Sequence, residues 1–212
     1  MATLSNDSNG GVDFITTFDG KLVQRVPEGT EGAVSRALTK GANEGKLVWE
    51  KTYTSVTGMF MGGGVEVKEF GQKKVKEIQV KLDDNILLQL PMNMLSAFAK
   101  PLPNIDVSKP VKVSVYKNKR GKAGMNLSQE VDGEWKNAEW AYTKETPNGL
   151  PQPEYDETLD EWDFKMHDRF LTIKVQEFFD APVTTPPPVQ EPVQTEEGEP
   201  ATYTDDGENL PF

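Results

Sequence analysis

Residues 74–99 read KVKEIQVKLDDNILLQLPMNMLSAFA, and this stretch decides the predicted fold. Ile78, Val80 and Leu82 alternate with polar residues, which is the period of a strand with one buried face. The Asp-Asp-Asn that follows predicts a turn, and the apolar run at 86–90 predicts a buried strand. Residues 91–99 carry apolar side chains at helical spacing, so we expect a short helix there.

Further strands are predicted on both sides of this stretch. Residues 47–61 and 65–70 are rich in strand-forming types, and residues 111–116 alternate apolar and polar before a loop and another strand at 123–129. The order is therefore strand, strand, strand, short helix, strand, strand. It predicts a mainly β chain with an OB-fold, a five-stranded Greek-key barrel whose short helix lies between strands 3 and 4. Another small β-barrel fits the same pattern.

Three regions are expected along the chain. Residues 1–30 are polar and Gly-rich, and we expect a flexible N-terminal arm. Residues 31–180 form the predicted folded domain, which contains a short helix at 33–38 and a C-terminal helix at 159–179. The apolar face of that C-terminal helix is predicted to consist of Leu159, Trp162, Met166, Phe170 and Ile173. Residues 181–212 form an acidic tail that we expect to be disordered, because six prolines and no aromatic residue occupy 182–200.

Composition limits the chemistry available to the chain. Cysteine is absent and His167 is the one histidine, which argues against thiolate metal sites, multi-histidine metal sites and most histidine-based catalysis. We therefore expect no catalytic residue, metal or cofactor. No apolar run approaches the roughly 20 residues that a membrane span needs. The absence of cysteine suits a reducing cytoplasm, so we expect a cytoplasmic location.

The net charge of −11 is unevenly distributed. Residues 181–212 hold seven acidic residues and no Lys or Arg, and residues 154–163 hold six more carboxylates. Outside these two segments the chain has 21 acidic and 23 basic residues, so the remaining part is slightly basic. We interpret the carboxylates at 154–163 as the start of a helix, where they favour the helix dipole. The alternative is a nuclease metal site, which requires carboxylates from separated elements.

Lys and Arg side chains lie beside aromatic residues in three places. After the outward-facing Lys112 and Tyr116, the loop carries Lys117, Lys119, Arg120 and Lys122. A second group is Trp49, Lys51 and Tyr53 on one strand face, and a third is Phe70 with Lys73 and Lys74. Cations that follow phosphates and rings that stack bases are what sequence-tolerant single-strand binding needs. A solvated hairpin tip explains the loop equally simply, and core packing explains the rings at 49 and 53.

The last residues of the sequence form the sharpest motif. Residues 204–212 read TDDGENLPF, an acidic run that ends in a terminal ring and its carboxylate. A partner can bury such a ring and bind the carboxylate with a basic residue, while the upstream acids steer the encounter. The predicted partner-binding residues are Asp205, Asp206, Glu208, Leu210, Pro211 and Phe212. The alternative is a solubilising tail that ends in Phe by chance.

This ending resembles the acidic tip of bacterial single-stranded-DNA-binding proteins, with Leu210 where they typically have Ile. About half of the chain is similar to phage-encoded single-stranded-DNA-binding proteins with an OB-fold. The similar segments are Val48-Trp49-Glu50, Leu82-Asp83-Asp84, Leu90-Pro91, Leu102-Pro103-Asn104-Ile105-Asp106, Lys109-Pro110-Val111, Thr143-Lys144-Glu145 and Pro147-Asn148-Gly149-Leu150-Pro151.

The resemblance implies a non-enzymatic protein that coats exposed strands during DNA replication, recombination and repair. It also implies that the tail recruits replication or repair proteins, and that a bacteriophage-encoded chain would act in the host cytoplasm. Homo-oligomerisation is left open. The alternative function is an acidic protein that mimics DNA and inhibits a DNA-binding enzyme.

Overall fold

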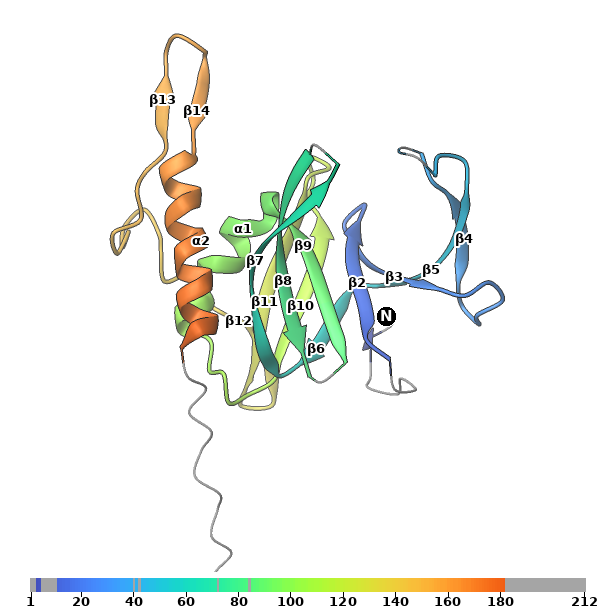
Figure 1. Ribbon diagram of the computed structural model, residues 1–212. Coiled ribbons are helices and arrows are strands. Elements are labelled where there is room, and N and C mark those ends of the chain that lie inside the picture. Colours follow the sequence, from blue (N-terminus) through green and yellow to red (C-terminus); the bar gives the residue numbers. More distant parts are fainter. Residues whose placement is uncertain are drawn as a thin grey trace, which may run out of the picture.

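The computed structural model describes residues 3–4, 11–39, 41, 43–71, 73–83 and 85–181 (Figure 1). The proposed partner-binding residues at 205–212, and all of the predicted tail after Ala181, lie outside this part of the chain. The side chain of Phe70 lies outside it as well.

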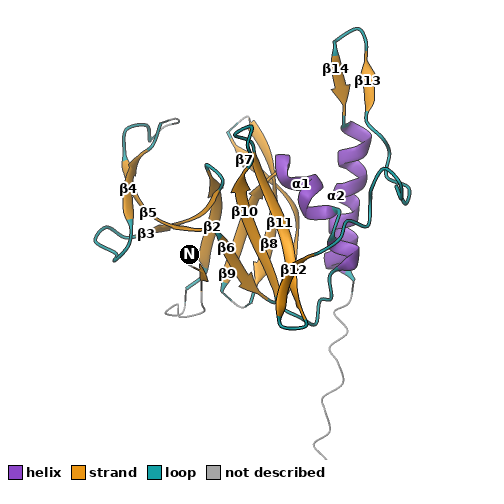
Figure 2. Cartoon of the chain, turned by 180° about the vertical axis from the view of Figure 1, so that it is seen from behind, coloured by secondary structure: helices purple, strands orange, loops and turns teal. Residues whose placement is uncertain are grey.

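The chain is mainly β, with two large sheets and a C-terminal helix (Figures 1 and 2). In spatial order, the seven-stranded sheet consists of β4 (Val34–Ala37), β5 (Leu47–Tyr53), β3 (Lys21–Val26), β2 (Asp13–Phe18), β9 (Ile86–Pro91), β8 (Lys73–Leu82) and β7 (Phe60–Phe70). The five-stranded sheet consists of β1 (Thr3–Leu4), β6 (Ser55–Gly58), β10 (Val111–Lys117), β11 (Ala123–Val131) and β12 (Glu134–Asn137). The chain passes from one sheet to the other between β5 and β6.

The core lies between the two sheets, and the alternating patterns place it there. In β8, Ile78, Val80 and Leu82 are all completely buried, as the sequence predicts. The valines of β10 at positions 111, 113 and 115 are buried too, while the residues between them face outward. Burial of one face fixes the register of each strand, because a slip of one residue would expose the whole apolar set.

Helical segments cover the side where the sheets are not joined. The predicted short helix after β9 is confirmed, as η1 (Met92–Met94) and α1 (Leu95–Ala99), followed by η2 (Leu102–Asn104). The C-terminal helix is α2 (Lys165–Asp180). Phe98 of α1 is fully buried and packs edge-on against Phe60 of β7 and parallel to Phe179 of α2. Strands β7 and β11 do not pair in the described part of the chain, so the sheets form no closed barrel there.

The N-terminal region contains more regular structure than the sequence suggests. Residues 13–26, which we place in a flexible arm, form the antiparallel hairpin β2–β3 inside the seven-stranded sheet. Ile15 and Leu22 are completely buried, so tertiary burial orders a segment with no clear period of its own. The helix predicted at 33–38 is wrong, since residues 34–37 are strand β4 paired with β5.

The C-terminal helix begins later than predicted. Residues 154–163 form a short hairpin of β13 (Glu154–Asp156) and β14 (Glu161–Asp163), which projects beyond α2 (Figure 1). Asp156 stabilises its turn, because Oδ1 accepts hydrogen bonds from the backbone N–H of Thr158 and Leu159 at 2.9 and 3.2 Å. The helix-start interpretation of this acidic block is therefore wrong, except that Asp163 accepts a bond from the Lys165 N–H at 2.7 Å.

The predicted apolar face of the C-terminal helix is also wrong, except at Phe170, which is partly buried against the core. Met166 and Ile173 are exposed, and the helix buries His167, Leu171 and Val175. The helix carries apolar residues on more than one side, and packing against β7 and α1 selects the buried stripe. No helix in the described ranges is long and apolar enough to cross a membrane.

Candidate nucleic-acid interface

One face of the five-stranded sheet points away from the core and is mostly polar. The register places Lys112 of β10 between Thr57 of β6 and Ser128 of β11. Ser128 in turn lies opposite Asn137 of β12, and its hydroxyl donates to the Asn137 side-chain oxygen at 2.8 Å. We name this surface the outer face and define it by Ser55, Thr57, Lys112, Ser114, Tyr116, Gly124, Asn126, Ser128, Glu130, Trp135 and Asn137.

Two aromatic rings are presented on the outer face. Trp135 of β12 is 38% exposed, and the Lys112 ammonium lies 4.0 Å from its ring centroid. Tyr116 of β10 is 44% exposed and lies opposite Gly124 of β11. A Cβ atom at Gly124 would lie 2.8 Å from Cζ of Tyr116, so the tyrosine ring rests directly over the glycine. The absence of a side chain at Gly124 thus lets this ring lie across the strand.

The loop after β10 carries cations on an ordered backbone. Asn118 organises it, because Oδ1 accepts hydrogen bonds from the backbone N–H of Arg120 and of Lys122, both at 2.9 Å. The Asn118 N–H also donates to the carbonyl of Lys122 at 2.9 Å, and Gly121 takes a positive φ of 74°. Lys119, Arg120 and Lys122 are exposed and form no ion pair with any residue that the structure describes. Their charges are therefore available to an anionic ligand.

The turn between β2 and β3 packs against the end of β10. Gly20 lies there at a φ of 75°, and a Cβ atom on it would come within 3.0 Å of the Lys117 backbone nitrogen. The Lys117 ammonium forms an ion pair with Asp19 of this turn. Lys117, one of the predicted DNA-binding cations, is thus partly neutralised by its own chain.

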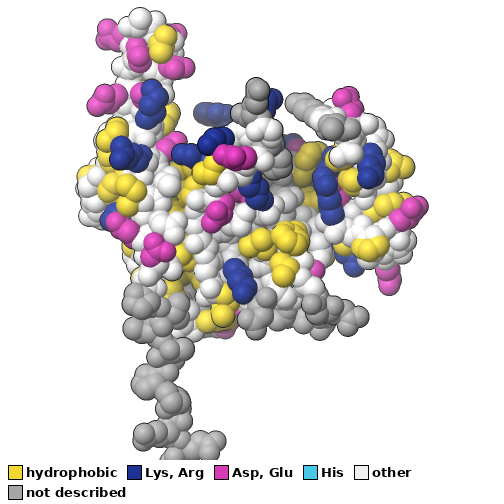
Figure 3. Space-filling model, in the orientation of Figure 1, with side chains coloured by type: hydrophobic (Ala, Val, Ile, Leu, Met, Phe, Trp, Pro, Cys, Tyr) yellow, Lys and Arg dark blue, Asp and Glu magenta, His cyan; other side chains and the backbone are white. Residues whose placement is uncertain are grey.

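Lys73 and Lys74 begin β8, at the tip of the β7–β8 hairpin, and Lys74 pairs with Glu69 at 2.9 Å. Figures 1 and 2 show this tip at the same end of the molecule as the β10–β11 loop. Lys and Arg side chains gather over that upper end in the space-filling view (Figure 3). The structure therefore brings two of the three predicted basic groups to one end of the fold.

The third predicted group lies elsewhere. Trp49, Lys51 and Tyr53 are half-buried on β5, in the seven-stranded sheet. The Tyr53 hydroxyl donates to the Gln24 side-chain oxygen at 2.9 Å, and the Gln24 amide donates to Asp13 at 2.8 Å. Burial, with the nearby Asp13 carboxylate, raises the pKa of Tyr53. This network holds the tyrosine ring in place, which favours the packing interpretation for Tyr53.

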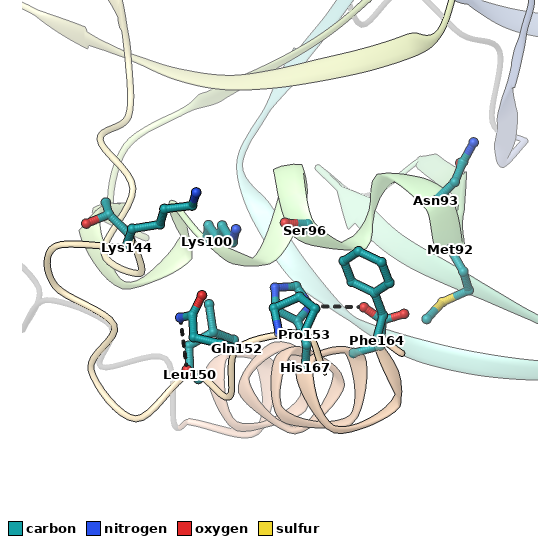
Figure 4. Close-up of a pocket in the computed structure, with 12 residues that line it drawn as sticks. Met92, Asn93, Ser96, Lys100, Lys144, Leu150, Gln152, Pro153, Phe164 and His167 are labelled. Carbon is teal, nitrogen blue, oxygen red and sulfur yellow. Dashed lines mark hydrogen bonds and ion pairs between the residues drawn. The ribbon is translucent and has the colours of Figure 1, made fainter. Parts of the chain in front are cut away.

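A cavity of about 570 Å³ lies between α1, α2 and the segment at 143–153 (Figure 4). Lys100, Lys144 and His167 line it together with apolar side chains such as Phe164. Burial lowers the pKa of Lys100, whose ammonium also lies 5.0 Å from the Trp140 ring centroid. His167 is buried, and its Nδ1 lies 3.1 Å from the Asp168 carboxylate. Within the described ranges, no group of three or more His, Asp or Glu residues is arranged to hold a metal ion.

The sequence analysis missed one group of an aromatic ring, a cation and a carboxylate, formed by Phe18, Arg36 and Glu50. The Arg36 guanidinium carbon lies 4.1 Å from the Phe18 ring centroid, and the same guanidinium is hydrogen-bonded to Glu50. These residues come from three strands and share no local motif, so only the arrangement of the strands could reveal them.

Comparisons with protein families, curated proteins and solved structures found no match to this chain.

Proposed function

We propose that this chain binds single-stranded DNA, with little sequence preference and without catalysis. The observation that carries the proposal is the outer face, where the exposed ring of Tyr116 adjoins the unpaired cations at 119–122 and the exposed ring of Trp135 lies beside Lys112, toward the other end of β10. Exposed rings stack bases of any identity, and neighbouring cations contact the phosphates that connect them.

An OB-related fold is part of the proposal. Small OB barrels bind oligonucleotides across the face of strands 2 and 3 and with the loops between strands 1 and 2 and between strands 4 and 5. Here the loop at 118–122 follows β10 and precedes β11, and α1 comes before this pair in the chain, as the OB order requires. The passage of the chain from β5 into β6 also joins the two sheets, as strands do in such barrels.

We further propose that the acidic end of the chain recruits partner proteins. Residues 205–212 combine carboxylates with the sequence Leu-Pro-Phe, which suits a partner with an apolar pocket beside a basic residue. Binding DNA through the domain and partners through the tail fits a cytoplasmic role in DNA replication, recombination and repair.

The loop cations are expected to set the salt dependence of binding. Each phosphate contact on a single strand contributes about 0.7 to the slope of log affinity against log salt. The triple variant Lys119→Ala, Arg120→Ala, Lys122→Ala should therefore bind oligo-dT more weakly at low salt, with a slope smaller by about 2. Fluorescence anisotropy with labelled oligo-dT at several salt concentrations measures both quantities.

A matched control removes the same charges from α2, by Lys165→Ala, Arg169→Ala and Lys174→Ala. Its affinity for oligo-dT should fall much less than that of the loop variant. Equal losses of affinity and slope in the two variants would show that overall charge, and not the loop, determines binding.

A further inference from the structure

Strands β2, β3, β5 and β4 form one end of the seven-stranded sheet, which we name the wing. In a flat sheet, β2 and β4 would be roughly 14 Å apart, because neighbouring strands are about 4.7–4.9 Å apart. Arg36 of β4 nevertheless reaches Phe18 of β2, with 4.1 Å between the guanidinium carbon and the ring centroid. The wing is therefore curled, and Figure 1 shows β4 turned back toward β2.

The concave side of the wing contains a cavity of about 200 Å³. This is smaller than the roughly 300–1,000 Å³ of pockets for drug-sized ligands, and it suits one small flat ring system. Its lining combines apolar side chains with two cations and two carboxylates: Phe18, Asp19, Lys21, Val23, Val34, Arg36, Glu50 and Thr52.

Arg36 is held rigidly at this cavity. Its Nε and Nη2 donate to the two oxygens of Glu50 at 2.9 and 2.7 Å, and Glu50 is only 7% exposed. The hydrogen bond to Glu50 raises the pKa of Arg36. A planar guanidinium fixed by two parallel bonds is already oriented, so little freedom is lost when a ligand stacks on it.

The electrostatics of the cavity favour an anionic strand. Glu50 is offset by Arg36 and by Arg25, whose Nε lies 3.9 Å away. Asp19 is paired with Lys117, which leaves the exposed Lys21 at the edge of the cavity. Phe18 is 48% exposed, and 27% of the Arg36 side-chain surface is exposed to solvent.

We propose that this cavity holds one base of a bound single strand, resting on the stacked pair that the Arg36 guanidinium and the Phe18 ring already form. Guanidinium planes and aromatic rings are the two surfaces on which unstacked bases rest. The β2–β3 turn contacts the end of β10 through Gly20 and the Asp19–Lys117 pair. A strand leaving Tyr116 on the outer face can therefore cross this turn to reach the cavity. The inference rests on the proposed function.

The test compares oligo-dT with an abasic strand of the same length, which keeps the phosphates and lacks the bases. Two variants of the full chain are used, Phe18→Ala and Arg36→Lys, and the second keeps the charge. Each should weaken oligo-dT binding by about 5- to 150-fold, the range measured for one stacked base, and leave abasic-strand affinity and salt slope unchanged.

Phe14→Ala is the matched control, because Phe14 is also on β2, is 55% exposed and does not line this cavity. It should leave oligo-dT affinity within about twofold of the intact protein. Thermal melting establishes that each variant is folded, and Phe18→Ala keeps the test valid if Arg36→Lys destabilises the wing.

Equal losses on both strands, or no loss on oligo-dT, would overturn the subsite while leaving the outer-face interface standing. If the intact protein binds no oligo-dT, the proposed function itself fails.

Discussion

Replacing Tyr116 and Trp135 together by alanine is expected to weaken oligo-dT binding by about 30-fold or more. Base–aromatic stacking contributes about 1–3 kcal/mol per base, so two rings together contribute about 2–6 kcal/mol. Each 1.4 kcal/mol is a factor of about ten in affinity. Both rings are exposed on the outer face, so their removal leaves the buried core intact.

Anisotropy of labelled oligo-dT is the appropriate measurement, because the variant lacks one of the tryptophans that would report binding by their own emission. The control is Tyr155→Ala with Trp162→Ala, which removes the same two ring types from the exposed hairpin β13–β14. This control should bind oligo-dT as the intact protein does. If both double variants bound equally well, the outer face would not be the interface.

Phe98→Ala is expected to lower the free energy of unfolding by about 3–5 kcal/mol. Phe98 is completely buried, and its ring contacts Phe60 at 6.5 Å and Phe179 at 6.4 Å between centroids. Its loss leaves a cavity at the junction of α1, β7 and α2. These helices cover the side on which the two sheets do not pair, so the cavity weakens the contact between the sheets.

Urea denaturation followed by circular dichroism measures this change. Phe14→Ala, at an exposed position, should alter the free energy of unfolding by no more than about 0.5 kcal/mol. A loss below about 1 kcal/mol for Phe98→Ala would show that the helices do not stabilise the junction. Below the unfolding transition, the Phe98 variant should still bind oligo-dT, since the outer face is on the other side of the five-stranded sheet.

The alternating strands could be predicted because their period also determines their burial. Ile78, Val80 and Leu82 alternate in the sequence and are all buried in β8. The hairpin at 13–26 has no such period, and it is ordered by the pairing of β2 with β9, more than 60 residues further along the chain. Pairing between segments so far apart cannot be derived from a local pattern.

The C-terminal helix shows a second limit. Met166 and Ile173 are spaced for one helix face, and Leu171 and Val175 for another. Periodicity establishes the helix without deciding which stripe is buried, and contact with β7 and α1 makes that choice. The segment before this helix is a hairpin, and the hydrogen bonds that Asp156 accepts stabilise its turn. The charges of that segment alone suggested a helix start.

The candidate site could be predicted only where it depends on a single strand. Alternation in β10 predicted that Lys112 and Tyr116 face outward, and they do. The partnership of Lys112 with Trp135 depends on the register of β12 against β11, which the sequence does not contain. The stacking of Arg36 on Phe18 depends on the curl of four strands.

One measurement tests the central claim most directly. The full chain is titrated with oligo-dT and with duplex DNA of equal length, at about 50 mM and about 200 mM salt. The proposed function predicts tight binding of the single strand at low salt, a steep loss of affinity at high salt, and much weaker binding of the duplex. Absence of oligo-dT binding at about 50 mM salt would contradict it.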